Sequence, residues 1–282
     1  MAHTLRSVAV TALLGLVGLT FRCYAAPVEI PLRLLPDAIP ISVKDINTYP
    51  AAVDAIIRAM VETFHLPVPR GKLLVYATRE DFELGLIEHL KITPELAKLT
   101  ARFAKSAVGG YIVLVNEQAV AGSPWPERIE LLAHELAHSV QLTLANRPGI
   151  ARPQWLIEGS AEWMAFNVTA ALKLDDMNNV RPRLADKVRE LRRKDQLPQL
   201  TKLNSFGQWV AARNNYSFDG TYSLAFLATD FLVAHHSFAR VADFFRRFET
   251  SNDHLANFKD VFGESVEDFE RRLKIHLDQL LK

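Results

Sequence analysis

Two histidines four residues apart, with a glutamate directly after the first, are the side chains in this sequence best suited to chemistry. They are His134, Glu135 and His138, in the segment HELAH. Residues four apart on a helix share one face, so both imidazoles could bind a single Zn²⁺ at about 2.1 Å. Glu135 would then lie near the open coordination position, where it could take a proton from a zinc-bound water. The spacing predicts a hydrolytic zinc site on one helical turn, with Glu135 as general base.

A third protein ligand is expected, because a catalytic zinc usually has three and keeps one position open. Glu158 follows His138 by twenty residues in the segment WLIEGSAE, which is enough chain for a second helix to lie alongside the first. Glu162 comes one turn later on the same face, where it could accept a hydrogen bond from a ligand histidine. The alternative is an ordinary amphipathic helix carrying the histidines and a solvated face carrying the glutamates. The apolar surroundings of His134 and His138 weaken that alternative, because buried histidines and glutamates need partners.

The elements that must position these residues follow from apolar spacing and helix start signals. Strands are predicted at residues 72–78 and 111–116, and the proline-rich segment 26–45 is expected to be an edge strand or a wrapping segment. The fold class is therefore α+β, with a small N-terminal mixed sheet in about 26–122 and a largely helical part in about 123–282. Helices are predicted at residues 48–65, 79–90, 93–107, 126–145, 158–172, 181–194 and 221–236, with a last helix beginning at Ser265.

The N-terminus has the features of a secretory signal peptide. Arg6 precedes an uncharged apolar run at residues 8–21, and cleavage after Ala25 fits the small residues there. We therefore divide the chain into a signal peptide (1–25) and one domain (26–282) that is secreted or periplasmic; an uncleaved N-terminal anchor is the alternative. Cleavage would remove the only cysteine, so histidines and carboxylates would have to hold any metal.

The charge balance excludes a strongly basic nucleic-acid binder. The 282 residues carry a formal net charge of +1, which would become −1 after cleavage. The basic segment 181–194 has interleaved acids and no aromatic residue, which is typical of a solvated helix face. We expect no nucleic-acid partner and no stable membrane insertion of the mature chain, and the oligomeric state is left open.

HELAH followed by WLIEGSAE resembles the gluzincin branch of the zincin metallopeptidases, and is closest to the bacterial peptidase MA-like family, which is related to M1 aminopeptidases and thermolysin. The resemblance covers roughly residues 109–236. It implies a zincin-like domain in which His134, His138 and Glu158 bind Zn²⁺ and Glu135 is the general base. It also implies that Glu162 supports the first histidine.

The same resemblance implies an oxyanion-stabilising tyrosine on a later helix. Tyr222 is the first candidate, with simple packing as its alternative, and Tyr216 and the pair His235/His236 are weaker candidates.

In this family a strand such as Tyr111–Asn116 borders the cleft and pairs with the substrate backbone, and Gly109 and Gly110 would allow close approach. The amine-binding G-x-M-E-N motif of M1 aminopeptidases is replaced here by GGYIV, which favours an endopeptidase or another amide substrate.

The sequence thus predicts a zinc metallopeptidase acting on a peptide or protein. Two other functions stay open. One is a non-proteolytic protein that uses the zincin fold to bind peptides, against which the intact Glu135 argues. The other is a zinc amidase acting on cell-wall substrates, which the sequence does not separate from a peptidase.

Overall fold

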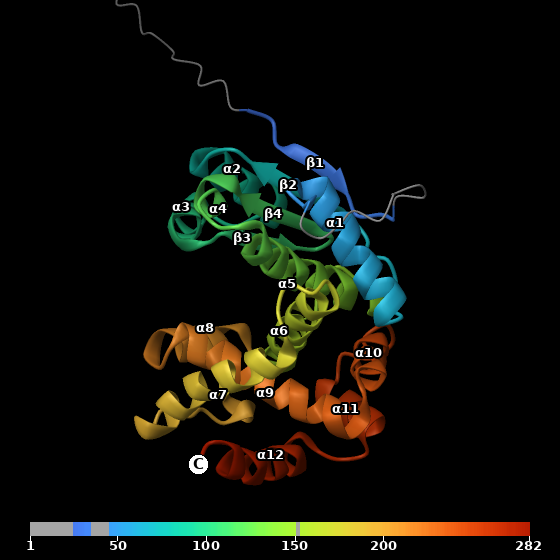
Figure 1. The fold of residues 1–282 in the computed structure, drawn as a ribbon, viewed down its shortest axis with the longest axis vertical. Coiled ribbons are helices and arrows are strands. Elements are labelled where there is room, and N and C mark those ends of the chain that lie inside the picture. Colours follow the sequence, from blue (N-terminus) through green and yellow to red (C-terminus); the bar gives the residue numbers. More distant parts are fainter. Residues whose placement is uncertain (1–24, 35–44, 151–152) are drawn as a thin grey trace, which may run out of the picture.

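A four-stranded mixed sheet forms the N-terminal part of the computed structural model, which describes residues 25–34, 45–150 and 153–282 (Figure 1). The strand order is β1-β2-β4-β3. The two inner strands pair in parallel, and each outer strand pairs antiparallel with its inner neighbour. The strands are β1 (Val28–Pro31), β2 (Lys72–Tyr76), β3 (Ser106–Gly109) and β4 (Ile112–Asn116). The small mixed sheet agrees with the prediction, and of the two alternatives for segment 26–45, an edge strand or a wrapping segment, the edge strand is found as β1. Residues 35–44 lie outside the described residues.

Successive residues of the inner strands face opposite layers, as the pleat of a strand requires. Leu73 and Val113 join the main core with helices α1 (Tyr49–Arg58), which continues as a π-helical turn at Ala59–Thr63, and α5 (Trp125–Leu144). Leu74 and Leu114 face a smaller cluster on the other side of the sheet. That cluster is covered by α2 (Arg79–Leu90) and α3 (Pro94–Phe103), and the short α4 (Glu117–Val120) follows β4.

Helices form the rest of the described chain, below α5 in Figure 1. Helix α6 packs on α5, and α9 packs on α6, so α6 lies between the other two. The elements are α6 (Gln154–Ala171), α7 (Met177–Arg193), a 3-10 turn (Leu200–Lys202), α8 (Phe206–Asn215), α9 (Phe218–His236), α10 (Phe238–Arg247), α11 (His254–Phe262) and α12 (Val266–Leu280). The α+β class with a helical C-terminal part agrees with the prediction.

The segment around Gly110 differs from the prediction. We expected the helix from residue 93 to reach 107 and the strand at 111–116 to border the cleft. Instead the helix ends at Phe103, and residues 106–109 form β3, which pairs with β4 through the two-residue turn Gly110-Tyr111. Gly110 has φ +57°, which a glycine adopts without strain, so Gly110 serves the hairpin turn while Gly109 ends β3. Strand β4 has a partner on both edges and cannot accept a substrate strand; β3 is the outer strand on this side.

Three helices begin earlier than their sequence signals suggested. Helix α6 starts at Gln154, after Pro153, and so places Glu158 in its second turn. Helix α7 starts after the N-cap Asp176, whose side chain accepts from Asn178 N, and contains Pro182. Helix α9 starts at Phe218 because the Ser217 side chain caps it by accepting from Gly220 N.

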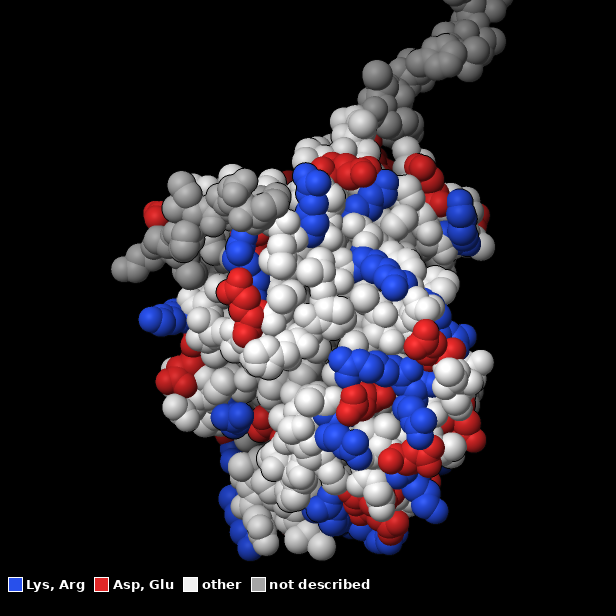
Figure 2. Space-filling view, turned by 90° about the vertical axis from the view of Figure 1, so that its right-hand side faces the viewer, with Lys and Arg blue, Asp and Glu red and all other residues white. Residues whose placement is uncertain are grey.

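Acidic and basic side chains are interspersed over the face drawn in Figure 2, with no large area of one sign. The N-terminal segment 1–24, which contains almost all of the predicted signal peptide, lies outside the described residues. Within the described ranges, no helix has the length and apolar character needed to cross a bilayer.

Candidate metal centre

Helix α5 holds the two histidines of the HELAH segment on one face. Because they are four residues apart, their rings lie one turn from each other, with centroids 4.8 Å apart. Their Nε2 atoms are 3.1 Å apart and therefore point to a common position. The helical spacing predicted from the sequence is confirmed.

Glu158 reaches the same position from the neighbouring helix α6. Its Oε2 lies 3.4 Å from His134 Nε2 and 3.7 Å from His138 Nε2. The three potential ligand atoms, one from each residue, all lie within 4.8 Å of one another. Two imidazoles and one carboxylate are a donor set typical of catalytic zinc. The structure thus brings together the three residues that we predicted as ligands.

Each of the three side chains has a polar group behind it. Gln141 Oε1 lies 3.1 Å from His138 Nδ1, and since an amide oxygen only accepts, Nδ1 donates. Gln154 Nε2 donates to Glu158 Oε1 at 2.8 Å. Glu162 Oε1 lies 3.3 Å from His134 Nδ1, where the ring N–H is not aligned with it, so this contact is an ion pair. These partners leave both Nε2 atoms and Glu158 Oε2 directed at the shared position, as a zinc site requires.

The charges in the cluster favour a protonated His134 beside an ionised Glu158. Burial opposes the charge on His134, but Glu158 and Glu162 outweigh it and raise the pKa of His134 well above its ordinary value. Burial likewise opposes the charge on Glu158, but the two histidines hold the pKa of Glu158 well below its usual range. A cation bound at the shared position would take over the role of the proton on His134.

Glu135 lies beside the histidines and faces the sheet. It is only 9% exposed, and its Oε1 accepts a 2.6 Å hydrogen bond from Ser106 Oγ on the outer strand β3. The sheet edge and the histidine helix thus meet at this carboxylate.

Tyr222 on α9 is the only one of the proposed oxyanion candidates that contacts the cluster. Its ring centroid lies 6.0 Å from that of His134. Burial and the charge of Glu158 raise the pKa of Tyr222 well above its ordinary value, so its phenol is neutral and can donate a hydrogen bond. Tyr216 follows α8 and is 42% exposed. The pair His235/His236 ends α9, about 20 Å along the helix from Tyr222, where the two side chains contact Phe231 and Glu264.

The approach of α9 to the cluster depends on Gly159, the residue after Glu158. A Cβ atom at this position would overlap the carbonyl oxygen of Ala225 and the hydroxyl of Thr229, both on α9. The absence of a side chain therefore lets the two helices approach closely and brings Tyr222 next to the cluster.

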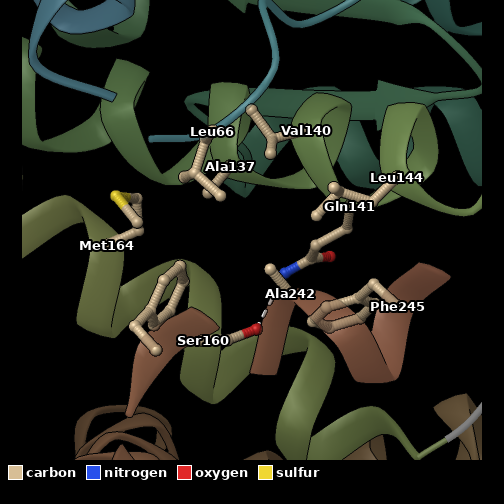
Figure 3. A pocket seen from close by; sticks show the side chains of 10 residues that line it. Leu66, Ala137, Val140, Gln141, Leu144, Ser160, Met164, Ala242 and Phe245 are labelled. Atoms are coloured by element: carbon tan, nitrogen blue, oxygen red, sulfur yellow. Dashed lines mark hydrogen bonds between the residues drawn. The ribbon is translucent and has the colours of Figure 1, made fainter. Parts of the chain in front are cut away.

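A small cavity of about 20 Å³ lies one turn further along α5 than the histidines (Figure 3). Its walls are apolar except for Gln141 and Ser160, where Gln141 Nε2 donates to Ser160 Oγ at 3.0 Å and to Ile157 O at 2.8 Å. The volume suits one water rather than a peptide side chain. The contribution of this region to the site is to fix the amide of Gln141 behind His138.

Comparison with known proteins found no matching family model, no similar curated protein and no similar solved structure. Resemblance to gluzincins therefore stays a prediction from the two motifs, and the roles of the site residues rest on their geometry and chemistry.

Three polar residues of this centre were not predicted from the sequence. Gln141 lies three residues after His138 on the same helix face, and Gln154 lies four before Glu158, so the same-face rule could have found both. Ser106 gave no usable signal, because its segment was predicted to be helical and its contact with Glu135 joins two distant parts of the chain.

Proposed function

We propose that this protein is a zinc-dependent metallopeptidase of the zincin type. The observation that carries the proposal is the convergence of His134, His138 and Glu158 on one position, with the carboxylate of Glu135 beside them. A Zn²⁺ ion held by these three residues would polarise a carbonyl group and lower the pKa of a coordinated water toward 7. Amide hydrolysis uses both effects.

Glu135 is the proposed general base. One of its oxygens is engaged by Ser106, and the other makes no hydrogen bond to a described residue. The free oxygen can therefore take a proton from the attacking water and later deliver it to the leaving amine. Because the carboxylate is buried on its sheet side, its orientation is fixed. A larger fraction of molecules therefore hold it in the geometry needed for proton transfer.

Tyr222 is the proposed donor to the developing oxyanion. Its phenol is neutral and packs beside His134, so a hydrogen bond from its hydroxyl could strengthen as negative charge grows on the substrate oxygen. Donors of this type contribute about 10²–10³ in rate. If Tyr222 has this role, the Tyr222→Phe variant should bind zinc normally and hydrolyse peptides slowly.

Zinc content and peptide cleavage test the proposal together. Wild type should bind about one zinc per chain by elemental analysis, and His134→Ala should lose it. Glu135→Gln should retain zinc and lose cleavage of a peptide library. Equal zinc content in wild type and His134→Ala would reject the metal site. Peptide binding without cleavage by both wild type and Glu135→Gln would favour a binding protein, and cleavage of cell-wall amides alone would favour an amidase.

We also propose that the mature protein acts outside the cytoplasm. The support is the apolar run at residues 8–21 followed by small residues near Ala25. N-terminal sequencing of the exported protein should begin at residue 26. An unprocessed N-terminus in a membrane fraction would instead indicate an anchor.

A further inference from the structure

Arg213 lies on the side of Tyr222 formed by helix α8. Its Cζ atom is 4.3 Å from the centroid of the Phe218 ring and 5.5 Å from that of Tyr222. Trp209, one turn earlier on the same helix, packs edge-on against Tyr222 with a centroid distance of 5.0 Å. Two aromatic faces therefore hold the guanidinium in a defined place next to the proposed oxyanion donor.

This guanidinium has no acceptor among the described residues. Its Nε is buried without a hydrogen-bond partner, and no described carboxylate forms an ion pair with it. Arg181 on α7 behaves differently, since it makes a two-pronged contact with Asp230 at 2.8 and 3.0 Å. A buried N–H without an acceptor is costly, so a partner outside the described chain is expected to complete the site.

The carboxylates closest to the cluster are already engaged. Glu158 contacts both histidines, and Glu162 contacts His134, so neither is available to Arg213. The cluster region is otherwise acidic, with Glu130 and Glu135 on the same helix. An anionic group of a substrate would be repelled there unless a cation received it, and the guanidinium of Arg213 is placed to do so.

The distance between this guanidinium and the cluster suits a peptide. The Tyr222 ring is near both, with its centroid 6.0 Å from that of the His134 ring and 5.5 Å from Arg213 Cζ. An extended chain advances about 3.3 Å per residue, so a group bound by Arg213 would lie within about three residues of the bond being cleaved.

We propose that Arg213 is a specificity-determining residue that binds a carboxylate of the substrate. The fork of N–H donors on a guanidinium matches the two oxygens of a carboxylate. The half-exposed ring of Phe218 (52% exposed) would form the apolar wall of this subsite. The carboxylate can come from an aspartate or glutamate side chain or from the C-terminus of the peptide. This inference rests on the proposed peptidase function.

Cleavage of matched peptides tests the proposed role of Arg213. Internally quenched peptides would carry Asp or Asn at each position within three residues of the cleaved bond, and would end in a free acid or an amide. Zinc-loaded wild type should prefer the acidic member of one pair by about 10- to 100-fold in kcat/KM, as expected for a charged hydrogen bond. A preference at an internal position identifies a side chain, and a preference for the free acid identifies the C-terminus.

Three variants separate recognition from packing. Arg213→Gln should lower kcat/KM on the acidic peptide about 10-fold more than on its neutral partner, and Arg213→Lys should keep part of the preference. Arg193→Gln is the control, because Arg193 is exposed on α7. An equal loss on acidic and neutral peptides in Arg213→Gln would assign Arg213 to packing against Tyr222 and overturn the inference.

A binding measurement tests this inference independently of the proposed peptidase function. Fluorescence anisotropy of labelled acidic and neutral peptides would be measured with zinc-loaded Glu135→Gln and with the double variant Glu135→Gln/Arg213→Gln. A preference for the acidic peptide that Arg213→Gln abolishes supports the inference even if wild type cleaves nothing. Equal binding of both peptides by Glu135→Gln overturns it even if wild type is an active peptidase.

Discussion

The hydroxyl of Ser106 donates a 2.6 Å hydrogen bond to Oε1 of Glu135, and so joins the outer strand of the sheet to the helix that carries both histidines. The residue proposed as general base is therefore held by an element that precedes it by 29 residues. A hydrogen bond to a carboxylate restricts its rotation. The bond from Ser106 would therefore hold Glu135 in the orientation in which it accepts a proton.

Ser106→Ala should therefore lower kcat about 10- to 100-fold with little change in KM, because a lost charge-assisted hydrogen bond is worth roughly 1.5–3 kcal/mol and acts here on the base alone. Steady-state kinetics on one peptide measure both constants. Ser106→Thr keeps the hydroxyl in a strand that tolerates β-branching and should restore most of the activity. A loss of zinc in Ser106→Ala would show that the serine instead supports the whole centre.

Gln141→Met should weaken zinc binding about 10- to 100-fold, the range found when a group supporting a ligand histidine is removed. The methionine preserves the volume but cannot accept from His138 Nδ1, so the ring is free to turn. Competition with a chromogenic chelator measures the affinity. The control is Gln199→Met, at an exposed position before the 3-10 turn. Equal zinc affinity in the two variants would contradict a supporting role for Gln141.

The ligand cluster could be predicted because its relationships are local. His134 and His138 lie four residues apart on one helix, and Glu158 and Glu162 lie four apart on another, so helix geometry alone places each pair on one face. The prediction that the two helices lie side by side needed only the short connection between them. Contacts such as Ser106 with Glu135 depend on how the sheet edge meets the helix, which no local pattern encodes.

The edge of the sheet and helix α8 show where sequence reasoning failed. The segment before Gly109 has helix-forming alanines, but the glycine turn and the strand that follows draw it into a hairpin, so tertiary pairing overrides local propensity. Helix α8 lacks a clear apolar stripe, since only Trp209 and Ala212 are buried. Its start was nevertheless marked by the capping box of Ser205 and Gln208, and that signal would have directed attention to Arg213.

Glu130 should make stability depend on pH near neutrality. Burial, with a contribution from the charge of Glu162, raises the pKa of Glu130 to about 7. The folded protein therefore binds a proton that the unfolded chain releases near pH 4.5, so stability from this group is fully present at low pH and is lost as pH rises through about 7.

Glu130→Gln removes that titration. It should increase the free energy of unfolding at pH 8 by about 1–3 kcal/mol and change it little at pH 4, because wild-type Glu130 is neutral there. Urea unfolding of the metal-free protein at both pH values gives the comparison. Glu95→Gln, at an exposed position on α3, is the control and should show no such pH dependence. An identical effect of Glu130→Gln at both pH values would argue against a raised pKa.

Gly159→Ala should disturb the centre through the distance between helices. The added methyl group would overlap Ala225 O and Thr229 Oγ1, and relief requires α9 to move away from α6. Overpacking of this kind costs about 1–3 kcal/mol, so the melting temperature should fall. Because Glu158 stays on α6 while Tyr222 moves with α9, kcat should fall further than zinc affinity. Gly207→Ala is the matched control, since a Cβ atom there meets nothing within 4 Å and alanine favours the helix. Normal stability and kcat in Gly159→Ala would mean that the close contact of α6 and α9 does not position Tyr222.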